Sequence, residues 1–387
     1  MGKIKYILTI VFILLAGSIK AQVSTMQVAD STSTGLYNSG DWKELIVFGN
    51  QTVKSGIDFP GLRLKIAYAY MMSGNFKLAL KNYDDILAND SYNETARFYA
   101  YLCNSYLNND LAASYNAGYM QNRNGLNSFA FIAAGAEFST KENDDINRGD
   151  ASYSRISLSN RLSWRWQLEQ SLAYYYQTIF RLSNSKNNSI DEADQQKEYY
   201  AKLSYAASAH FSILGAYHYV NTNFKTSVDN SNLGFIGARF TAPYFDLQVD
   251  MNFGNLDKKP IEQYNGKFTF YPTGNFNFYT ISRVSDQHLN ASDHIILSQA
   301  IGFKLIKNTW LESSVTIGNQ DDYLDADGLY IYNAIDKTTF KCGETLFYQL
   351  SRHMQLQLNY VYEKKDDSYQ SLNYDQNSIT LGLIWKF

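Results

Sequence analysis

The chain has 387 residues, with 32 Tyr, 23 Phe and 5 Trp but only four Pro and two Cys. Charged residues make up 18%, below the roughly 25% of a typical soluble domain, and the formal net charge is −3. This balance lacks the basic excess of a nucleic-acid-binding protein, so no nucleic-acid partner is expected. Two cysteines, Cys103 and Cys342, exclude a disulfide scaffold and a cysteine-rich metal site. Many aromatic residues with few prolines favour abundant β-structure.

Residues 1–21 have the features of a secretory signal peptide. Lys3 and Lys5 form a positive start, residues 6–16 are apolar, and a segment with small residues ends at Ala21, where we expect cleavage. An uncleaved membrane anchor is the alternative, but the apolar run is short for a span. Further along, no apolar run approaches the roughly 18 residues that a membrane helix needs. Membrane insertion of the mature chain is therefore expected only as a β-barrel.

Residues 22–125 are expected to form a periplasmic helical domain of about five helices. Apolar residues recur there at helical spacing, as at Leu62, Ile66 and Tyr70. A weak repeat of 34 residues is also visible, because Trp42 and Phe76 are 34 positions apart. The first repeat lacks most of its leading helix in this reading.

Small and aromatic residues define the expected core of that repeat. They are Trp42, Ala67, Tyr70, Gly74, Phe76, Ala79 and Tyr83. This pattern resembles a tetratricopeptide repeat, in which small residues let paired helices approach and aromatic residues fill the groove between them. Another kind of stacked helical hairpin remains the alternative. In either case the helices are expected to dock a periplasmic protein or to brace the neighbouring domain.

After Gly125 the period of the apolar residues changes from 3.6 to 2, which is typical of strands. The last strand shows this period most clearly, because every second residue is apolar: Ile379, Leu381, Leu383, Trp385 and Phe387. An alternating strand that ends in Phe resembles the C-terminal signal of bacterial outer-membrane barrels. Trp385 and Phe387 are therefore expected to be read by the barrel-insertion machinery.

Connections predict the topology of residues 126–387. Six short turns are expected near Arg165, Ala209, Pro243, Thr273, Asn308 and Arg352. Seven long polar loops are expected at 141–150, 183–197, 221–231, 254–263, 285–293, 319–336 and 364–373. Their strict alternation predicts an antiparallel transmembrane β-barrel of about 14 strands, with short turns and helices in the periplasm and long loops outside. Because residues 328–334 could add an extended piece, 12 or 16 strands remain open.

Aromatic residues near the short turns are expected to form an interfacial girdle in contact with outer-membrane lipid. They are Trp164, Trp166, Tyr244, Phe245, Tyr271, Trp310 and Trp385.

No catalytic, cofactor or metal site is expected in the barrel. The residues that could support catalysis are His210, His218, His288, His294 and Asp293. Asp293 and His294 lie close in sequence to Ser285 and Ser298, but spacing alone does not assemble a Ser–His–Asp set. Residues 321–327 faintly suggest a calcium loop, yet the Gly at the turn and the closing Glu are missing. A solvated outward loop is the preferred interpretation.

The inward face is expected to be mixed and mildly basic. Its ten basic positions are Arg155, Arg161, Arg181, Lys202, Arg239, Lys267, Arg283, Lys304, Lys341 and Lys386. Its six acidic positions are Glu137, Glu169, Asp246, Asp250, Glu312 and Glu363. Such a lumen could favour anionic solutes or saccharides, with Tyr175, Tyr200 and Tyr271 as stacking surfaces. Alternatively, opposite charges pair across the lumen and close it.

The order of signal peptide, short helical-repeat arm and C-terminal barrel resembles the YaiO-type outer-membrane barrel proteins of Bacteroidetes. The resemblance implies a multi-domain α plus all-β protein of the outer membrane and no settled activity. The order also resembles exopolysaccharide secretion porins, although their repeat arrays are longer. The leading hypothesis is a non-enzymatic barrel in envelope transport or organisation, with the helices as a periplasmic contact. A channel for saccharides or small anions and a barrel enzyme are the alternatives.

Overall fold

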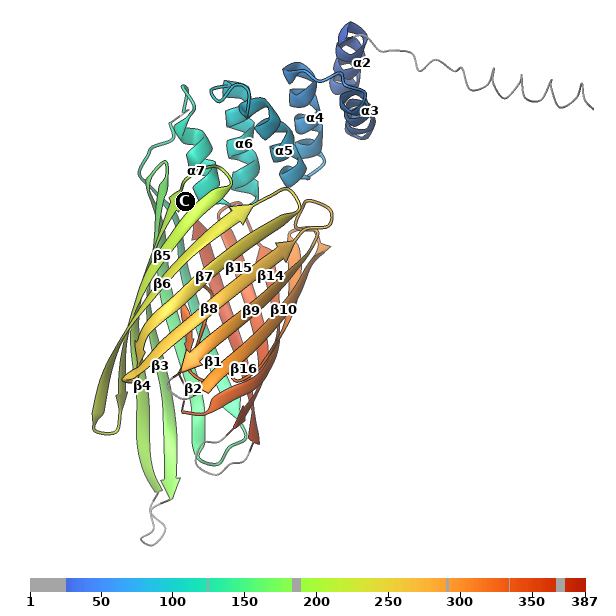
Figure 1. Ribbon diagram of the computed structural model, residues 1–387. Coiled ribbons are helices and arrows are strands. Elements are labelled where there is room, and N and C mark those ends of the chain that lie inside the picture. The colour runs from blue at the N-terminus through green and yellow to red at the C-terminus, as the bar shows by residue number, and fades with distance from the viewer. Residues whose placement is uncertain (1–25, 124, 183–188, 290–291, 334, 367–372) are drawn as a thin grey trace, which may run out of the picture. The chain divides into compact units, whose positions relative to one another are not determined.

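The computed structural model of the protein describes residues 26–123, 125–182, 189–289, 292–333, 335–366 and 373–387. The expected signal peptide, residues 1–21, lies outside these residues. Within the described ranges the chain begins with six helices (Figure 1). They are α2 (Met26–Ser39), α3 (Trp42–Lys54), α4 (Pro60–Met72), α5 (Phe76–Leu87), α6 (Glu94–Tyr106) and α7 (Asp110–Gly118). None of the helices in this part of the chain is long and apolar enough to cross a membrane.

Fourteen of the described strands form one closed antiparallel barrel (Figure 1). In chain order they are β1 (Ala130–Asn143), β2 (Arg148–Ser163), β3 (Trp166–Leu182), β4 (Ser189–Ala206), β5 (Phe211–Phe224), β6 (Ser227–Thr241), β7 (Phe245–Leu256), β8 (Lys259–Phe270), β9 (Phe278–Leu289), β10 (Ser292–Ile306), β11 (Thr309–Ile317), β14 (Lys337–Gln349), β15 (Met354–Asp366) and β16 (Asn373–Lys386). Two further short strands, β12 (Tyr323–Asp325) and β13 (Tyr330–Tyr332), pair only with each other. The predicted fold class and strand number are confirmed.

The last strand closes the barrel by pairing with the first. In this ladder Ala134 lies opposite Trp385, and Thr140 lies opposite Ile379. Every second residue of β16 from Ile379 onward, up to Phe387 beyond its end, is exposed on the outside of the barrel, as the alternation predicts. Exposed apolar side chains continue around the other strands, which gives the barrel an apolar outer face and a polar inner face. This is the arrangement of an outer-membrane-type barrel.

The six predicted short turns all lie at one end of the barrel, which we call the helical end because α5–α7 lie there (Figure 1). The prediction of long loops at the opposite end is mostly wrong, because most of the residues assigned to those loops belong to strands. Strands β5 and β6 are joined by residues 225–226, and β7 and β8 by residues 257–258. Asp257 and Lys258 both have positive φ, as a tight hairpin turn requires. The polar segments extend the strands because a strand beyond the membrane needs no apolar face.

The helices follow the 34-residue repeat more fully than the sequence indicated. Helices α2, α4 and α6 begin at residues 26, 60 and 94, and α3, α5 and α7 begin at 42, 76 and 110. The side chains of Asp41, Asn75 and Asn109, again 34 apart, accept hydrogen bonds that cap α3, α5 and α7. The described part of the chain has six helices where about five were expected, and the first repeat includes a leading helix, α2, of 14 residues.

The chain divides into two compact units, residues 1–73 and 74–387. In the first unit Ala67 is fully buried, Tyr70 accepts a hydrogen bond from Asn50 at 2.8 Å, and Trp42 lies edge-on to Tyr68.

In the second unit helices α5–α7 belong with the barrel. Ala79 and Tyr83 are fully buried, and Phe76 stacks on Tyr106 with ring centroids 4.9 Å apart. Gly74 has a φ of +73°, a backbone conformation that residues with a side chain rarely adopt.

Candidate functional site

Helices α5–α7 dock onto the rim of the barrel at its helical end. Lys77 at the start of α5 forms an ion pair with Asp246 of β7 at 3.0 Å and lies over the ring of Tyr271. Its side chain is only 4% exposed, and burial lowers the pKa of its ammonium group although Asp246 opposes this. Asn75 donates to the carbonyl of Thr273 at 2.7 Å. The first helix of this unit is therefore fixed to the turns after β6 and β8.

Helix α7 and the loop before it contact other strand ends. Lys386 of β16 donates to Asn108 at 2.5 Å, and Arg165 donates to Tyr119 at 2.9 Å. Trp164 lies against Gly118 so closely that a Cβ at this glycine would be 2.8 Å from the Trp164 Cβ.

Three members of the expected aromatic girdle face the protein instead of lipid. Trp164 packs on α7, and Tyr271 is buried beside Lys77. Trp310 lies opposite Phe347 and beside Lys304, on the inward face. Trp166, Tyr244 and Trp385 are exposed on the barrel, as a girdle requires. The prediction was wrong for Trp164 and Tyr271 because these residues contact the helices, and for Trp310 because its position in the strand points inward.

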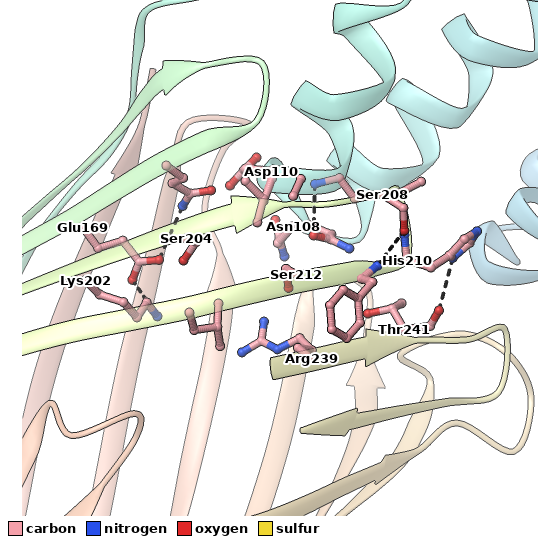
Figure 2. A pocket seen from close by; sticks show the side chains of 18 residues that line it. Asn108, Asp110, Glu169, Lys202, Ser204, Ser208, His210, Ser212, Arg239 and Thr241 are labelled. Atoms are coloured by element: carbon pink, nitrogen blue, oxygen red, sulfur yellow. Dashed lines mark hydrogen bonds and ion pairs between the residues drawn. The ribbon is translucent and has the colours of Figure 1, made fainter. Parts of the chain in front are cut away.

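Between the helices and the barrel lie two neighbouring cavities of about 130 and 260 Å³. Figure 2 shows the smaller one, with Asn108 and Asp110 from the helical side and Glu169, Lys202, His210 and Arg239 from the barrel. Burial raises the pKa of the Asp110 carboxyl, although Lys386 and Arg161 oppose this. The larger cavity contains Lys77, Lys81, Arg239 and Lys267 against Asp84 and Asp246, so its lining has a basic excess.

The segment 319–336 folds into the barrel, which contradicts the prediction of an outward solvated loop. We call it the inner hairpin; it contains β12 and β13, and residue 334 lies outside the described residues. Leu324 packs on Leu233, Leu256 and Ile261 of the barrel wall. The side chain of Gln263 bonds both backbone groups of Leu324, at 2.7 and 3.0 Å. The hairpin is therefore seated by apolar packing and by hydrogen bonds.

Two aspartates of the inner hairpin contact basic side chains of the wall. Asp327 lies 3.2 Å from Lys202 and 3.8 Å from Arg239. Asp325 pairs with Arg283 and lies 3.8 Å from Lys341. Burial alone would raise the pKa values of both carboxyls, but these cations hold them below their usual range. The calcium-loop interpretation is wrong for these two residues because Lys and Arg take the place of a metal.

The hairpin has two legs, the first containing β12 and the second running from β13 to Asp336. The second leg ends in a buried ion pair. Asp336 accepts from Arg148 of β2 at 2.7 and 3.0 Å and from the hydroxyl of Tyr374 at 3.1 Å. Tyr330 on the same leg accepts from Arg155 at 2.8 Å and donates to Glu137 at 3.0 Å. Both legs are thus fixed to the wall.

A cavity of about 480 Å³ remains beside the inner hairpin. Its lining extends from Phe347 and Gln357, near the helical end, to Asp194 and Glu363, near the opposite end. The carboxylates in this lining are Glu137, Asp194, Glu198, Glu312, Asp325 and Glu363, and the lysines are Lys141 and Lys341. The mildly basic lumen expected from the sequence therefore does not describe this cavity, whose lining is acidic.

The predicted lumen residues divide into three groups by their partners. Lys202, Arg239 and Arg283 contact the inner hairpin. Arg161, which donates to Ser114, and Asp246 contact the helices. Arg155 contacts both the hairpin, through Tyr330, and Glu137 of the wall. The others contact the wall or line the helical-end cavity: Glu169 with Lys202, Asp250 with Asn265, Glu312 with Tyr279, Lys304 over Trp310, and Lys267 in the cavity. The side chain of Arg181 lies outside the described set.

The histidines do not assemble a catalytic set among the described residues. Asp293 contacts His288 at 2.8 Å and not His294, which instead lies 3.0 Å from Ser292. Ser285 lies 3.3 Å from the hydroxyl of Tyr323. His218 contacts Glu198 and the carbonyl of Gly328, so it supports the inner hairpin.

Sequence reasoning missed Arg148, Tyr330, Asp336 and Gln263 as lumen residues. One signal was available: residues 319–336 contain five Asp and no Lys or Arg, next to a barrel with an excess of basic inward positions. Only the three-dimensional course of the loop shows that the two sets meet.

The chain matches no family model and no curated protein. Among solved structures it is similar to a mutant of the monoaromatic hydrocarbon channel TodX, with 9% identity over 68% of this chain and 91% of that one and a TM-score of 0.48. It is also similar to the toluene transporter TodX of Pseudomonas putida, with 8% identity, coverage of 68% and 90%, and a TM-score of 0.45. A bacterial polysaccharide outer membrane secretin gives 8% identity, coverage of 66% and 98%, and a TM-score of 0.41. The assignment of a barrel fold depends on the closed order of the strands in this chain and not on these similarities.

Proposed function

We propose that this protein is a non-enzymatic outer-membrane barrel in envelope transport or organisation, of the YaiO-like kind, whose lumen is closed at rest by its own inner hairpin. The tetratricopeptide-like helices would lie in the periplasm and dock a periplasmic protein. Outer-membrane barrels have short periplasmic turns, and here the short turns share the helical end with α5–α7. Trp385 and Phe387 would serve insertion by the barrel machinery.

The observation that carries this proposal is the position of the inner hairpin. It crosses the lumen and pairs with cations on opposite parts of the wall, Arg148 on β2 and Arg283 on β9. Buried ion pairs whose remaining groups are also hydrogen-bonded resist removal of either partner. A barrel filled in this way is not a freely diffusive pore, whereas a loop that enters from one end can leave again without unfolding the barrel.

Planar-bilayer conductance tests the proposal. The purified chain is expected to give little or no steady current, whereas a variant with residues 320–335 replaced by a short Gly-Ser linker is expected to conduct. Heat-modifiable gel mobility of both proteins would verify that the barrel is folded. If both are silent, or if both conduct equally, the hairpin does not close the lumen and the proposal fails.

A channel for saccharides or small anions is the second candidate. The cavity of about 480 Å³ beside the hairpin favours this candidate. Its lining residues extend from near the helical end to near the opposite end of the barrel. Steady ohmic current of porin size from the unmodified chain would support this candidate over a barrel that is closed at rest.

A further inference from the structure

We propose that the wall beneath the inner hairpin is a binding track for an acidic oligosaccharide, and that the aspartates of the hairpin occupy its carboxylate subsites while the barrel is closed. This inference rests on the proposed function, because it requires that the hairpin can leave the lumen. It adds the chemical class of the solute that would replace the hairpin.

The hairpin and the wall are opposite in charge. Residues 319–336 contain five Asp and no Lys or Arg. The described cations of the wall that contact the hairpin are Arg148, Arg155, Lys202, Arg239, Lys259, Arg283, Lys341 and Lys365. Glu137 is a wall carboxylate that also contacts it, through Tyr330. Arg155 and Lys202 also pair with wall carboxylates, Glu137 and Glu169. The surface that the hairpin covers therefore has more cations than carboxylates.

Three subsites are recognisable from their geometry. Arg148 holds both carboxylate oxygens of Asp336, at 2.7 and 3.0 Å, which is the bidentate contact by which Arg recognises carboxylates.

The other two subsites hold Asp325 and Asp327. Asp325 is shared by Arg283 and Lys341, and Asp327 by Lys202 and Arg239. Each pair of cations lies on two different strands, so the barrel scaffold itself sets the spacing between the charges.

Neutral hydrogen-bonding groups surround these subsites. Gln248 donates to Asp327 at 2.8 Å, the hydroxyl of Tyr200 donates to its carbonyl at 2.9 Å, and Gln287 donates to the carbonyls of Asp321 and Asp322 at 3.0 Å. Amide and hydroxyl groups between fixed cations suit a ligand that alternates carboxylates with hydroxyls. A uronate oligosaccharide has this chemistry, whereas a small inorganic anion would use only one subsite.

Removal of the hairpin should make the lumen more basic. With the hairpin in place, the cavity beside it is lined by six carboxylates and two lysines, and of these carboxylates Asp325 belongs to the hairpin and the other five to the wall. Without it, the wall loses the five Asp of the segment and exposes the cations that they neutralise. The closed lumen should therefore prefer cations in any residual current, and the open one should prefer anions.

The test compares the full chain with the linker variant in a KCl gradient. We expect an anion-selective reversal potential for the linker variant, and block of its current by trigalacturonate but not by maltotriose. Replacing Arg239→Gln in that variant should weaken trigalacturonate block by about tenfold, since one charge-assisted contact is lost. Lys258→Gln, in the β7–β8 turn, is the matched control and should change nothing.

A second variant covers the case in which the linker variant misfolds. The full-length double substitution Asp325→Asn with Asp327→Asn keeps the chain intact and frees the same cations, and it should bind trigalacturonate in calorimetry where the unmodified chain does not. Cation-selective current, or equal block by maltotriose, would overturn this inference and leave the proposed function standing. No current from any variant would instead contradict the proposed function, and calorimetry would then decide the binding track alone.

Discussion

Arg148 and Asp336 join the first part of the barrel to the end of the inner hairpin, 188 positions later in the chain, by two hydrogen bonds of 2.7 and 3.0 Å. Both side chains are almost completely buried, at 3% and 2% exposure. Tyr374 of β16 donates to the same carboxylate. This small network fixes the second leg of the hairpin to strands β2 and β16, beside the closure of the barrel.

Arg148→Gln should free that leg of the hairpin. The substitution removes the Arg148 cation from the buried Asp336 carboxylate, and loss of one member of a buried ion pair typically costs about 3–5 kcal/mol. We expect faster proteolysis within residues 319–336 and a lower unfolding temperature in detergent. Lys258→Gln is the control: Lys258 pairs with Asp229 but is 76% exposed, so its loss should change little. Equal effects of the two substitutions would show that the Arg148 contact does not hold the hairpin.

The contact between α5 and the barrel should weaken as the pH rises. His210 lies 3.1 Å from Asp84 of α5 and 3.1 Å from the carbonyl of Thr241, and the hydrogen bond with Asp84 raises the pKa of the imidazole although burial and Lys77 oppose this. A raised pKa stabilises the docked state below the ordinary value of about 6.5, and this stabilisation is lost as the pH rises through the raised pKa.

Hydrogen exchange of α5 measures this effect. We expect stronger protection near pH 6 than near pH 8.5, by less than about 1 kcal/mol because His210 is partly exposed. His210→Gln should remove the pH dependence. An unchanged profile in that variant would assign the dependence to another group.

Gly118 sets how closely α7 approaches the barrel. A Cβ there would lie 2.8 Å from the Cβ of Trp164, which cannot move away as the end of a flexible side chain can. Gly118→Ala should therefore loosen α7, with a packing cost of about 1–3 kcal/mol, and should raise its hydrogen exchange. Gly35→Ala in α2 is the matched control, since nothing lies within 4 Å of its Cβ position and the helix should gain about 0.5–1 kcal/mol. Similar exchange in both variants would contradict the close packing.

The outer face of β6 offers a matched pair for its contact with lipid. Ile236 and Val228 point outward from the same strand with exposures of 56% and 57%, but Ile236 is in the body of the strand and Val228 is at its far end. Ile236→Arg should destabilise the barrel in lipid by about 2–4 kcal/mol and Val228→Arg by about 0–1. Denaturant titrations of barrels refolded into liposomes measure both values. Equal costs would contradict the assignment of this face to the membrane.

The barrel could be predicted from the sequence because its outer face must be apolar along every strand. The alternation from Ile379 to Phe387 shows this most directly, and the short turns could be placed because little sequence separates the strands there. Beyond the membrane both faces of a strand can be polar, so the same pattern fails, and residues 221–231 and 254–263 were mistaken for loops. The 34-residue period predicted pairs of helices, because helix caps and the tight turns between helices depend on residues that are close together in the sequence.

The inner hairpin could not be predicted because its partners are distant in sequence. Asp327 meets Lys202 and Arg239, which are 125 and 88 positions away, and an acidic loop looks the same in sequence whether it contacts water or basic residues. For the same reason Trp164 and Tyr271 resembled girdle residues. Their neighbours on α5 and α7 are visible only once the helices are placed on the barrel.

Cysteine labelling tests the seat of the inner hairpin most directly. In a background with Cys103→Ser and Cys342→Ser, the detergent-purified variants Leu324→Cys and Ile146→Cys are compared for their rate of reaction with a water-soluble maleimide. Leu324 is 1% exposed inside the barrel and Ile146 is 79% exposed in the β1–β2 connection. We predict rapid labelling of Ile146→Cys and strong protection of Leu324→Cys until the protein is unfolded. Equal labelling rates in the folded barrel would contradict a lumen closed by its own hairpin.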